Sequence, residues 1–461
     1  MPDDAPPPAD DDPSRRKGAY TGQSVPRPEA RSKVTGALKY IDDQAFDGLH
    51  GVTVRSKIAR GRVTNVRFCD GGPDWREFAI VTAKDVPRLG CDGNDRNMVD
   101  LLQRDQPYLV RDEIRHMHEP IVLLAHHDRE TAREALKHIE ITYEEALPLL
   151  DYTVPPTDEQ VQHGDNNVFH RIVVSKGAAD EDDGDASFDA VFADAATIVQ
   201  GVYRTSAQEQ CYIEPNCVTA RVEIDDPAEM TGAVWPRNGM KLVVEGSMQC
   251  PYYVHKAMTT LFELPEERIQ IIATALGGGF GGKEDYPSII AGHAALLALK
   301  SRQSVKILYD RVEDMVATTK RHPSRTMLRT AHDEKGRLLG VDMNVLMDGG
   351  AYVTLSPVVL SRGAIHAVGP YRVDHVRVIN EVVLSNTPPN GAFRGFGAPQ
   401  TVFAFERHLD ICADTFGMDP ADMRRLNLIE QGDSLAVSQV IEEPIRLHEW
   451  LDLALDDIEY S

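Results

Sequence analysis

Residues 276–284 read Leu-Gly-Gly-Gly-Phe-Gly-Gly-Lys-Glu, so five glycines fall within six consecutive positions. The apolar run before them, 268–275, predicts a short buried strand. The run after them, 287–300, predicts a helix with an apolar face and a proline in its first turn. Glycine is favoured where the chain takes positive φ or where a ligand approaches the backbone. Free N–H groups near a helix start also attract anionic or oxo groups. We therefore expect a cofactor at this loop.

Two familiar motifs match parts of the loop. The spacing Gly277-x4-Gly282-Lys283 fits a phosphate-binding loop, but that motif continues with Ser or Thr, and this chain has Glu284. The spacing Gly277-x-Gly279-x-x-Gly282 fits a dinucleotide fingerprint, and 305–310 offers a second strand that ends in an acid. This fingerprint is weak on its own. A nicotinamide-type site and a simple connecting turn are therefore both open at this point.

The composition of the chain limits its partners. Its 461 residues are enough for two to four domains, and 42% hydrophobic residues indicate a globular protein. The formal charge of −23 argues against nucleic acid or an anionic membrane surface as the main partner. The first residues are acidic and proline-rich, unlike a secretory signal. The longest apolar helix expected, at 289–299, is too short to span a bilayer.

Cysteine and histidine spacing predicts no metal cluster held by side chains of this chain. The cysteines are scattered without any C-x-x-C pair, which argues against a zinc ribbon or an iron–sulfur cluster. The histidines, of which His126 and His127 are the densest group, also lack metal-ligand spacing. Scattered thiols fit a reducing compartment, so we expect a cytoplasmic protein. The cysteines are Cys69, Cys91, Cys211, Cys217, Cys250 and Cys412.

Patterns along the chain predict four segments. Residues 1–25 are expected to be a disordered acidic and proline-rich tail. Residues 26–148 alternate between strand and helix signals, 149–190 form a polar linker with an acidic excursion at 180–185, and 191–461 alternate again. The predicted fold class is mixed α/β (α+β), with a substantial antiparallel share.

Individual elements can be placed within these segments. A strand at 121–125, a helix capped near Asp128 and ending at Lys137, and a strand at 139–143 form a β-α-β pattern. Further strands are expected at 241–244 and 340–346, and a closing helix at 447–458.

Several motifs, in the right order, resemble the large molybdenum-binding subunit of the xanthine dehydrogenase and aldehyde oxidase family. The resemblance covers roughly residues 30–440. The chain is similar to the N-terminal part of a split form of that subunit, as in nicotinate dehydrogenase-type enzymes. It implies a hammerhead-type α/β domain at 26–148, then the first half of the molybdopterin-binding domain at 191–461. The matching stretches are 36–43 (GALKYIDD), 208–209 (QE), 212–215 (YIEP), 247–249 (SMQ), 277–284, 310–315 (DRVEDM), 321–323 (RHP), Arg362 with 369–371 (GPY), and 390–400 (NGAFRGFGAPQ).

The resemblance also implies a cofactor. In that family molybdenum is held by the dithiolene of a pterin, and the protein supplies oriented donors and a shaped pocket. By position, Gln249 would donate to a molybdenum oxygen, and the backbone of Phe280 and Gly281 would lie against the metal, with Gly279 in the same loop. The backbone of Arg394 would lie against the pterin. Whether the pterin carries an added cytosine nucleotide is open.

Three further positions imply a substrate class. Glu284 and Arg362 match residues that recognise the purine in xanthine-oxidising members, and Phe396 matches a ring that packs on the substrate. Aldehyde-oxidising members tend to lack this Glu and Arg, and carbon monoxide-oxidising members place a Cys where this chain has Gly395. A purine or related N-heterocycle is therefore expected, with nicotinate and aldehydes as alternatives.

In the family this subunit continues for several hundred residues, and the later half carries the glutamate that acts as general base. No matching pattern follows Glu430 here. We therefore expect no general base in this chain, and separate partner chains for the second molybdopterin domain, a ferredoxin-like [2Fe-2S] module and a FAD module. The ferredoxin-like and FAD chains would accept the electrons released by a hydroxylation whose oxygen atom comes from water. The alternatives are a non-catalytic truncated paralogue or assembly partner, and a nucleotide-binding oxidoreductase.

Overall fold

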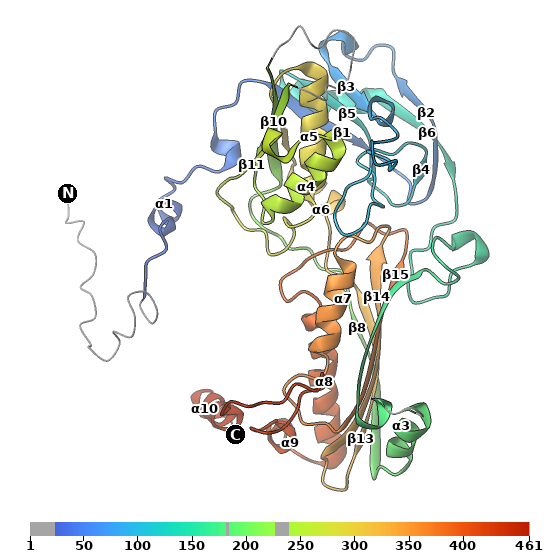
Figure 1. Cartoon of the computed structure of the whole chain (residues 1–461), viewed down its shortest axis with the longest axis vertical. Helices are drawn as coiled ribbons and strands as arrows, with labels where there is room; N and C mark the ends of the chain where they lie inside the picture. The colour runs from blue at the N-terminus through green and yellow to red at the C-terminus, as the bar shows by residue number, and fades with distance from the viewer. Residues whose placement is uncertain (1–23, 181–183, 226–238, 461) are drawn as a thin grey trace, which may run out of the picture.

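Two large β-sheets, one in each of two lobes, organise the chain (Figure 1). The computed structural model describes residues 24–180, 184–225 and 239–460. The expected disordered tail at 1–25 therefore lies almost wholly outside the described residues, as does the centre of the acidic run at 180–185. Strands and helices alternate through both lobes, which confirms the mixed α/β class.

The upper lobe is built on a mixed seven-stranded sheet in the order β11-β10-β9-β12-β1-β5-β3. Strand β12 lies at its centre, because it pairs parallel to β1 and antiparallel to β9. The two domains predicted from the sequence, 26–148 and 191–461, thus share one sheet. The strands are β1 (Leu49–Arg55), β3 (Ala79–Thr82), β5 (Pro120–His126), β9 (Cys217–Ile224), β10 (Met240–Gly246), β11 (Ile269–Ala273) and β12 (Val305–Leu308).

Helix α5 (Pro287–Ser301) follows the glycine-rich loop and forms the centre of the upper core, beside α4 (Pro251–Phe262). Every residue of α5 from Pro287 to Leu299 is buried, so the helix is enclosed on all sides rather than on one face as expected. The reason is that the segment around Tyr108 covers the side away from the sheet. The ring nitrogen Nε2 of His293 lies 2.7 Å from the Tyr108 carbonyl oxygen, so this buried histidine has a hydrogen-bond partner.

The expected β-α-β pattern at 121–143 is present as β5, α2 (Arg129–Ala135) and β6 (Ile139–Glu145), and the Asp128 side chain caps α2. The two strands lie in different sheets, however. Strand β6 alternates between buried and exposed residues and pairs antiparallel with β2 (Gly61–Phe68) in a three-stranded sheet completed by β4 (Glu113–Ile114). Period-2 burial of this kind is typical of a strand with one solvated face.

The lower lobe is a long five-stranded sheet in the order β7-β15-β14-β13-β8. Helices α7 (Ser356–Ile365) and α8 (Ala398–Phe416) lie end to end along one face (Figure 1), and their apolar residues share a core with the sheet. The strands are β7 (Val168–Lys176), β8 (Thr197–Thr205), β13 (Ser324–His332), β14 (Leu338–Gly350) and β15 (His375–Leu384).

The structure corrects the expected linker at 149–190. That range holds the strand β7, which pairs with β15 over most of its length, and most of helix α3 (Gly184–Ala193). The apolar residues Phe169, Ile172 and Val174 of β7 pack against the lower core. This apolar run is short and lies between polar stretches, so the local sequence pattern does not mark it as a strand.

The remaining helices are short or peripheral. They are α1 (Ala30–Val34), α6 (Arg311–Ala317), α9 (Pro420–Asn427) and α10 (Leu447–Asp457). The expected strands at 241–244 and 340–346 and the helix at 447–458 agree with β10, β14 and α10. Within the described residues, no helix combines the length and apolar character needed to cross a membrane.

Buried polar contacts join the two lobes. The hydroxyl of Tyr352 in the lower lobe donates to the carboxylate of Glu119 in the upper lobe. The backbone nitrogen of Val353 donates to Asp105 Oδ2 at 2.7 Å. These contacts fix the position of the lower lobe relative to the glycine-rich loop, and a large cavity opens beside that loop.

Candidate cofactor and substrate site

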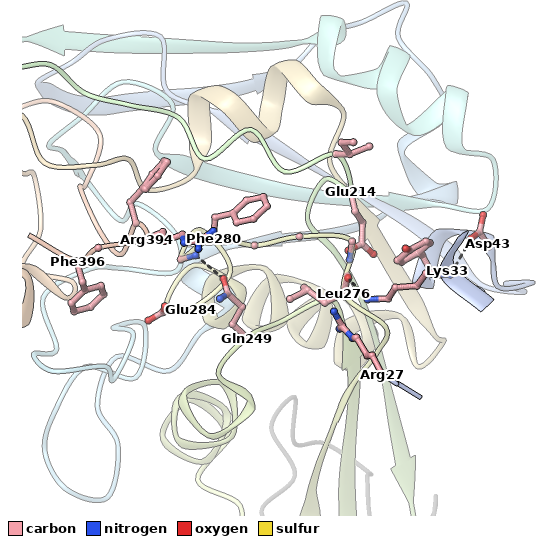
Figure 2. A pocket seen from close by; sticks show the side chains of 18 residues that line it. Arg27, Lys33, Asp43, Glu214, Gln249, Leu276, Phe280, Glu284, Arg394 and Phe396 are labelled. Atoms are coloured by element: carbon pink, nitrogen blue, oxygen red, sulfur yellow. Dashed lines mark hydrogen bonds between the residues drawn. The ribbon is translucent and has the colours of Figure 1, made fainter. Parts of the chain in front are cut away.

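A cavity of about 1030 Å³ is lined by parts of the chain that are far apart in sequence, and three of these parts supply most of its residues (Figure 2). The first is the glycine-rich loop, 276–281, with Glu284 just beyond it. The second is the loop 393–396, which precedes α8. The third is the N-terminal segment that includes Arg27 and Lys33.

The two loops contact each other through their backbones. The nitrogen of Arg394 donates to the carbonyl oxygen of Phe280 at 2.9 Å. Gly281 has φ of +102°, and a Cβ at this position would lie 2.7 Å from the carbonyl carbon and oxygen of Ala392. Only glycine allows both this positive φ and the close approach of the Ala392 carbonyl group.

The other glycines of the loop also make room for protein atoms. A Cβ at Gly277 would lie 2.5 Å from Glu214 Cβ, and a Cβ at Gly279 would lie 2.3 Å from Gln249 Oε1. Gly278 takes φ of +101°. The expected positive φ is therefore found, but close packing within the protein, rather than the approach of a ligand, accounts for the missing side chains.

Lys283 does not act as the lysine of a phosphate-binding loop. Its side chain is fully buried, and its Nζ donates to the Glu214 carbonyl, to Glu214 Oε2 and to Ser247 Oγ at 2.7, 3.0 and 2.9 Å. Burial lowers the pKa of this amine. The helix α5 starts only at Pro287, so the loop does not form the helix N-terminus either. Both features argue against the phosphate-loop interpretation.

Gln249 is held with its amide in a defined orientation. Its Oε1 accepts hydrogen bonds from the backbone nitrogens of Gly281 and Lys283 at 2.9 and 3.3 Å. Two backbone donors fix which side-chain atom is oxygen, so the amide nitrogen is the other one. No described residue accepts from that nitrogen, and Gln249 lines the cavity (Figure 2). The side chain thus offers a positioned donor.

Three neighbouring backbone N–H groups are also free of partners among the described residues. They belong to Gly278, Gly279 and Phe280, whereas the nitrogens of Gly277 and Gly281 donate to Glu214 and Gln249. Successive N–H groups beside an amide donor suit a group with oxygen acceptors, such as oxo ligands or phosphate. The donor set therefore fits an oxygen-bearing cofactor.

Two phenylalanines in the cavity wall have positive φ, which is rare for a residue of this size. Phe280 has φ of +49° and Phe396 has φ of +52°, and both line the cavity. Backbone conformations of this kind cost roughly 1–3 kcal/mol and tend to occur at ligand sites. Phe280 is 47% exposed, so its ring is available to a flat ligand.

Glu284 provides a carboxyl group without a partner. It is half-buried, lines the cavity, and makes no side-chain hydrogen bond to any described residue. Burial, and secondly the charge of Asp285, raise the pKa of Glu284. Burial also raises the pKa of Asp285, to about 6. A raised pKa keeps a carboxyl protonated to higher pH than usual, and the protonated form can donate a hydrogen bond.

The two arginines expected at the site are placed differently from each other. Arg394 lines the cavity and contributes its backbone nitrogen to the contact with Phe280. Arg362 does not line the cavity, and its side chain lies on α7. The cavity lining thus includes Glu284 but not Arg362, and the expected pairing of the two across one pocket stays a prediction. Helix α7 packs against the loop before α8 through Val359 and Gly363, which leaves Arg362 outside that contact.

Sequence reasoning missed the contribution of the N-terminal segment. Arg27, Lys33, Tyr40 and Asp43 line the cavity, although the motifs mark only 36–43 of this segment, as the start of a domain. The basic residues of 27–33 follow an acidic tail, and this change of charge is the signal that could have found them. Within the described part of the chain, no group of three or more His, Cys, Asp or Glu side chains is arranged to hold a metal ion.

Comparison with known families identifies the fold and the type of site. Residues 35–147 match the a/b hammerhead domain of aldehyde oxidase and xanthine dehydrogenase, and residues 163–428 match the molybdopterin cofactor-binding domain. The second match alone covers more than half of the chain. This chain belongs to the xanthine dehydrogenase family. Its members are molybdopterin-dependent oxidoreductases, and the resemblance seen in the sequence is confirmed.

Two relatives of the xanthine dehydrogenase family differ in how much of their length this chain covers. A probable xanthine dehydrogenase subunit of Bacillus subtilis is 34% identical over 88% of this chain, which spans 51% of that relative. The nicotinate dehydrogenase large molybdopterin subunit of Eubacterium barkeri is 30% identical over 94% of this chain, which spans 95% of that relative. The chain thus corresponds to about half of the first and nearly all of the second.

Solved structures support the same fold. The chain superposes on the aldehyde oxidoreductase of Desulfovibrio gigas with a TM-score of 0.79 at 23% identity, over 94% of this chain and 46% of that one. It superposes on the CO dehydrogenase of Oligotropha carboxidovorans with a TM-score of 0.80 at 22% identity, over 95% of this chain and 54% of that one. The hammerhead domain followed by the first cofactor-binding domain is therefore the architecture of this xanthine dehydrogenase relative.

Proposed function

We propose that this chain is the molybdenum-binding component of a hydroxylase that acts on a purine or a related N-heterocycle. The donor set formed by the Gln249 amide and the free N–H groups of Gly278, Gly279 and Phe280 carries the proposal. A molybdopterin group, when bound, would supply the oxidation of a substrate carbon with oxygen taken from water.

The residues of the chain would bind and orient. The amide of Gln249 would donate to an oxygen on the metal, and its carbonyl already holds the loop at Gly281 in place. The backbone of Phe280 and Gly281, with Gly279, would form the wall beside the metal, and the backbone of Arg394 would support the pterin. Because the loop is braced by buried contacts, these donors are positioned before a ligand arrives.

The substrate would lie between Glu284 and the rings of Phe280 and Phe396. A flat heterocycle can stack on an aromatic ring and hydrogen-bond to a carboxyl through its polar edge. In its protonated form, which its raised pKa extends to higher pH, the Glu284 carboxyl would donate to a ring nitrogen or carbonyl. Arg362, on α7, does not line the cavity. A second candidate substrate is nicotinate, which is favoured by the match to a nicotinate dehydrogenase subunit over 95% of its length.

Other polypeptides would complete the enzyme. The match over 95% of a nicotinate dehydrogenase large molybdopterin subunit supports a multi-subunit enzyme. We propose that a second molybdopterin-domain subunit supplies the general base and closes the cavity. Electrons would leave through a ferredoxin-like iron–sulfur subunit and a FAD subunit. All six cysteines are free, which supports a cytoplasmic complex. The cofactor would be the molybdenum pterin in its simple or its cytosine dinucleotide form.

The proposal is tested on the complex isolated by a tag on this chain from its native host. We expect about one molybdenum and one pterin per copy of the chain, and turnover of xanthine, hypoxanthine or nicotinate with an artificial electron acceptor. Gln249→Glu keeps the oxygen acceptor and removes the amide donor, so it should lower turnover while the chain stays folded. A complex without molybdenum, isolated from cells supplied with molybdate, would contradict the proposal and favour a non-catalytic assembly partner.

A further inference from the structure

Two of the matching stretches in the sequence, 208–209 and 321–323, have no role in the proposed function, and the structure brings them together. Gln208 and Arg321 form an isolated antiparallel bridge, in which the Arg321 backbone nitrogen donates to the Gln208 carbonyl oxygen at 3.0 Å. The Nε of Arg321 also donates to Gln208 Oε1 at 2.9 Å. Gln208 therefore fixes Arg321 through both the main chain and the side chain.

Arg321 contacts the cavity wall formed by the loop 393–396. Its Cζ lies 3.8 Å from the centroid of the Phe393 ring, and its Nη2 donates to the Arg394 carbonyl oxygen at 3.1 Å. Phe393 and Arg394 line the cavity, whereas Arg321 does not. The positive charge of Arg321 is thus separated from the cavity only by residues of the wall.

This charge has no anionic partner among the described residues. Arg321 is only 8% exposed, forms no ion pair within the described part of the chain, and its buried Nη1 makes no hydrogen bond. Burial lowers the pKa of Arg321. The carboxylate of Glu209 is already paired, because its Oε2 lies 2.8 Å from Lys320 Nζ. A buried guanidinium without a counter-ion is unfavourable, and the Phe393 ring offsets only part of that cost.

An anionic group in the cavity would supply the missing counter-charge. A dithiolene binds its metal through two thiolate sulfurs, so the metal–sulfur end of such a cofactor is negatively charged. A buried wall has a lower effective dielectric constant than water, so the attraction between this end and a guanidinium behind the wall is only weakly screened.

We propose that Arg321 is the buried counter-ion of the metal–dithiolene end of the cofactor and acts from behind Phe393 and Arg394. This inference rests on the proposed function, because it adds a positioning residue to the same cavity. Arg321 touches neither substrate nor cofactor. Its charge stabilises the loaded state and leaves the cofactor-free state with an unpaired cation.

Gln208→Glu tests the assignment while Arg321 is kept. The new carboxylate replaces an amide oxygen that lies 2.9 Å from Arg321 Nε, so it pairs with the guanidinium and neutralises its charge. In the isolated complex, molybdenum and pterin should be released about tenfold faster than from the wild type. Metal analysis of the filtrate over time measures this rate. The cofactor-free complex, from a host that cannot make the pterin, should instead unfold at a higher temperature.

These two opposite effects separate a counter-ion from a simple brace of the loop. If Arg321 only braces the loop, the stronger contact made by Gln208→Glu slows cofactor release or leaves it unchanged, and this outcome would overturn the inference. The matched control is Gln200→Glu, which adds the same charge at an exposed position of β8 outside the cavity lining. It should leave the release rate unchanged; equally fast release in this control would also overturn the inference.

Substitutions of Arg321 itself give an independent comparison. Arg321→Lys keeps the charge but loses the planar fork of donors, whereas Arg321→Gln keeps an amide donor and loses the charge. Arg321→Lys should therefore retain the cofactor about tenfold longer than Arg321→Gln. Equal retention would contradict the counter-ion role, and if Arg321→Gln does not fold, Gln208→Glu decides alone. A wild-type complex without molybdenum would refute the proposed function instead.

Discussion

The backbone carbonyl oxygen of Phe280 accepts a hydrogen bond from the backbone nitrogen of Arg394 at 2.9 Å. This contact joins the loop that follows β11 to the loop that precedes α8, so one wall of the cavity is made from both lobes. Any change that separates the two loops should disturb the site without touching a ligand-binding side chain.

Gly281→Val tests this relationship. The new Cβ would meet the Ala392 carbonyl at 2.7 Å in a backbone with φ of +102°, so we expect a loss of about 2–5 kcal/mol in unfolding free energy. Urea denaturation of the chain measures it, and cofactor content should fall in parallel. The control is Gly417→Ala, where φ is +63° but no atom lies within 4 Å. This variant should lose only about 1 kcal/mol, and equal losses in the two variants would show that crowding at the loop contact is unimportant.

Glu284 should set the pH dependence of substrate capture. Its pKa is raised by burial and by Asp285, so the protonated form persists to higher pH than in a free carboxyl. If this form donates to the heterocycle, kcat/KM falls as pH rises through that pKa. Glu284→Gln cannot titrate and should remove this limb of the profile.

Arg362 supplies a comparison for Glu284. Glu284→Ala should lower kcat/KM by about 10²-fold, because the polar edge of the substrate loses its hydrogen-bond partner in the cavity. Arg362→Ala should lower it by less than about tenfold, because its side chain lies outside the cavity lining. Equal losses at unchanged molybdenum content would mean that Arg362 reaches the substrate when the complex is assembled.

The buried pair of Lys283 and Glu214 should be a large contributor to the stability of the loop. Lys283→Met leaves the Glu214 carboxylate without its cation, so we expect a loss of about 3–5 kcal/mol. Adding Glu214→Gln removes the unpaired charge and should restore part of the loss. A double-mutant cycle by urea denaturation measures the coupling, and a coupling near zero would contradict the assigned role.

Glu119 predicts a stability change with pH. Burial raises its pKa to about 7 from an ordinary value of 4.5, and it accepts hydrogen bonds from Tyr352 and from the backbone of Arg115. Between these two values the folded chain holds a proton that the unfolded chain has lost. The unfolding free energy should therefore fall by about 1–3 kcal/mol as pH rises through this window. Glu119→Gln should flatten this decrease; an unchanged slope would assign the effect to other groups, such as Asp285.

The sequence was a good guide to local elements and to the backbone of the site. The strand, loop and helix around residues 268–301 agree with the structure, because glycine density and apolar periodicity act over short distances. Gln249, Phe280, Glu284, Arg394 and Phe396 come together in one cavity, as the resemblance implied. Their individual roles stay predictions.

Features that depend on distant contacts were not predictable. The burial of α5 on all sides depends on Tyr108, which lies far away in sequence. Strand β7 looks like part of a linker until β15 is placed beside it. Arg362 lies on α7 and is not among the residues that line the cavity, which no motif encodes. Long-range pairing of this kind overrides local patterns.

The central position of β12 has a consequence for recombining these proteins. Residues 49–126 cannot be exchanged as an independent module. Strand β1 pairs with β12 on one side, and β12 in turn pairs with β9. A chimaera would have to preserve the alignment of Leu49 with Val305 and of Gly51 with Ile307. Substitutions at these facing positions of β1 and β12 should therefore occur together among relatives. Hybrids that combine mismatched residues at these positions should fail to assemble the upper lobe.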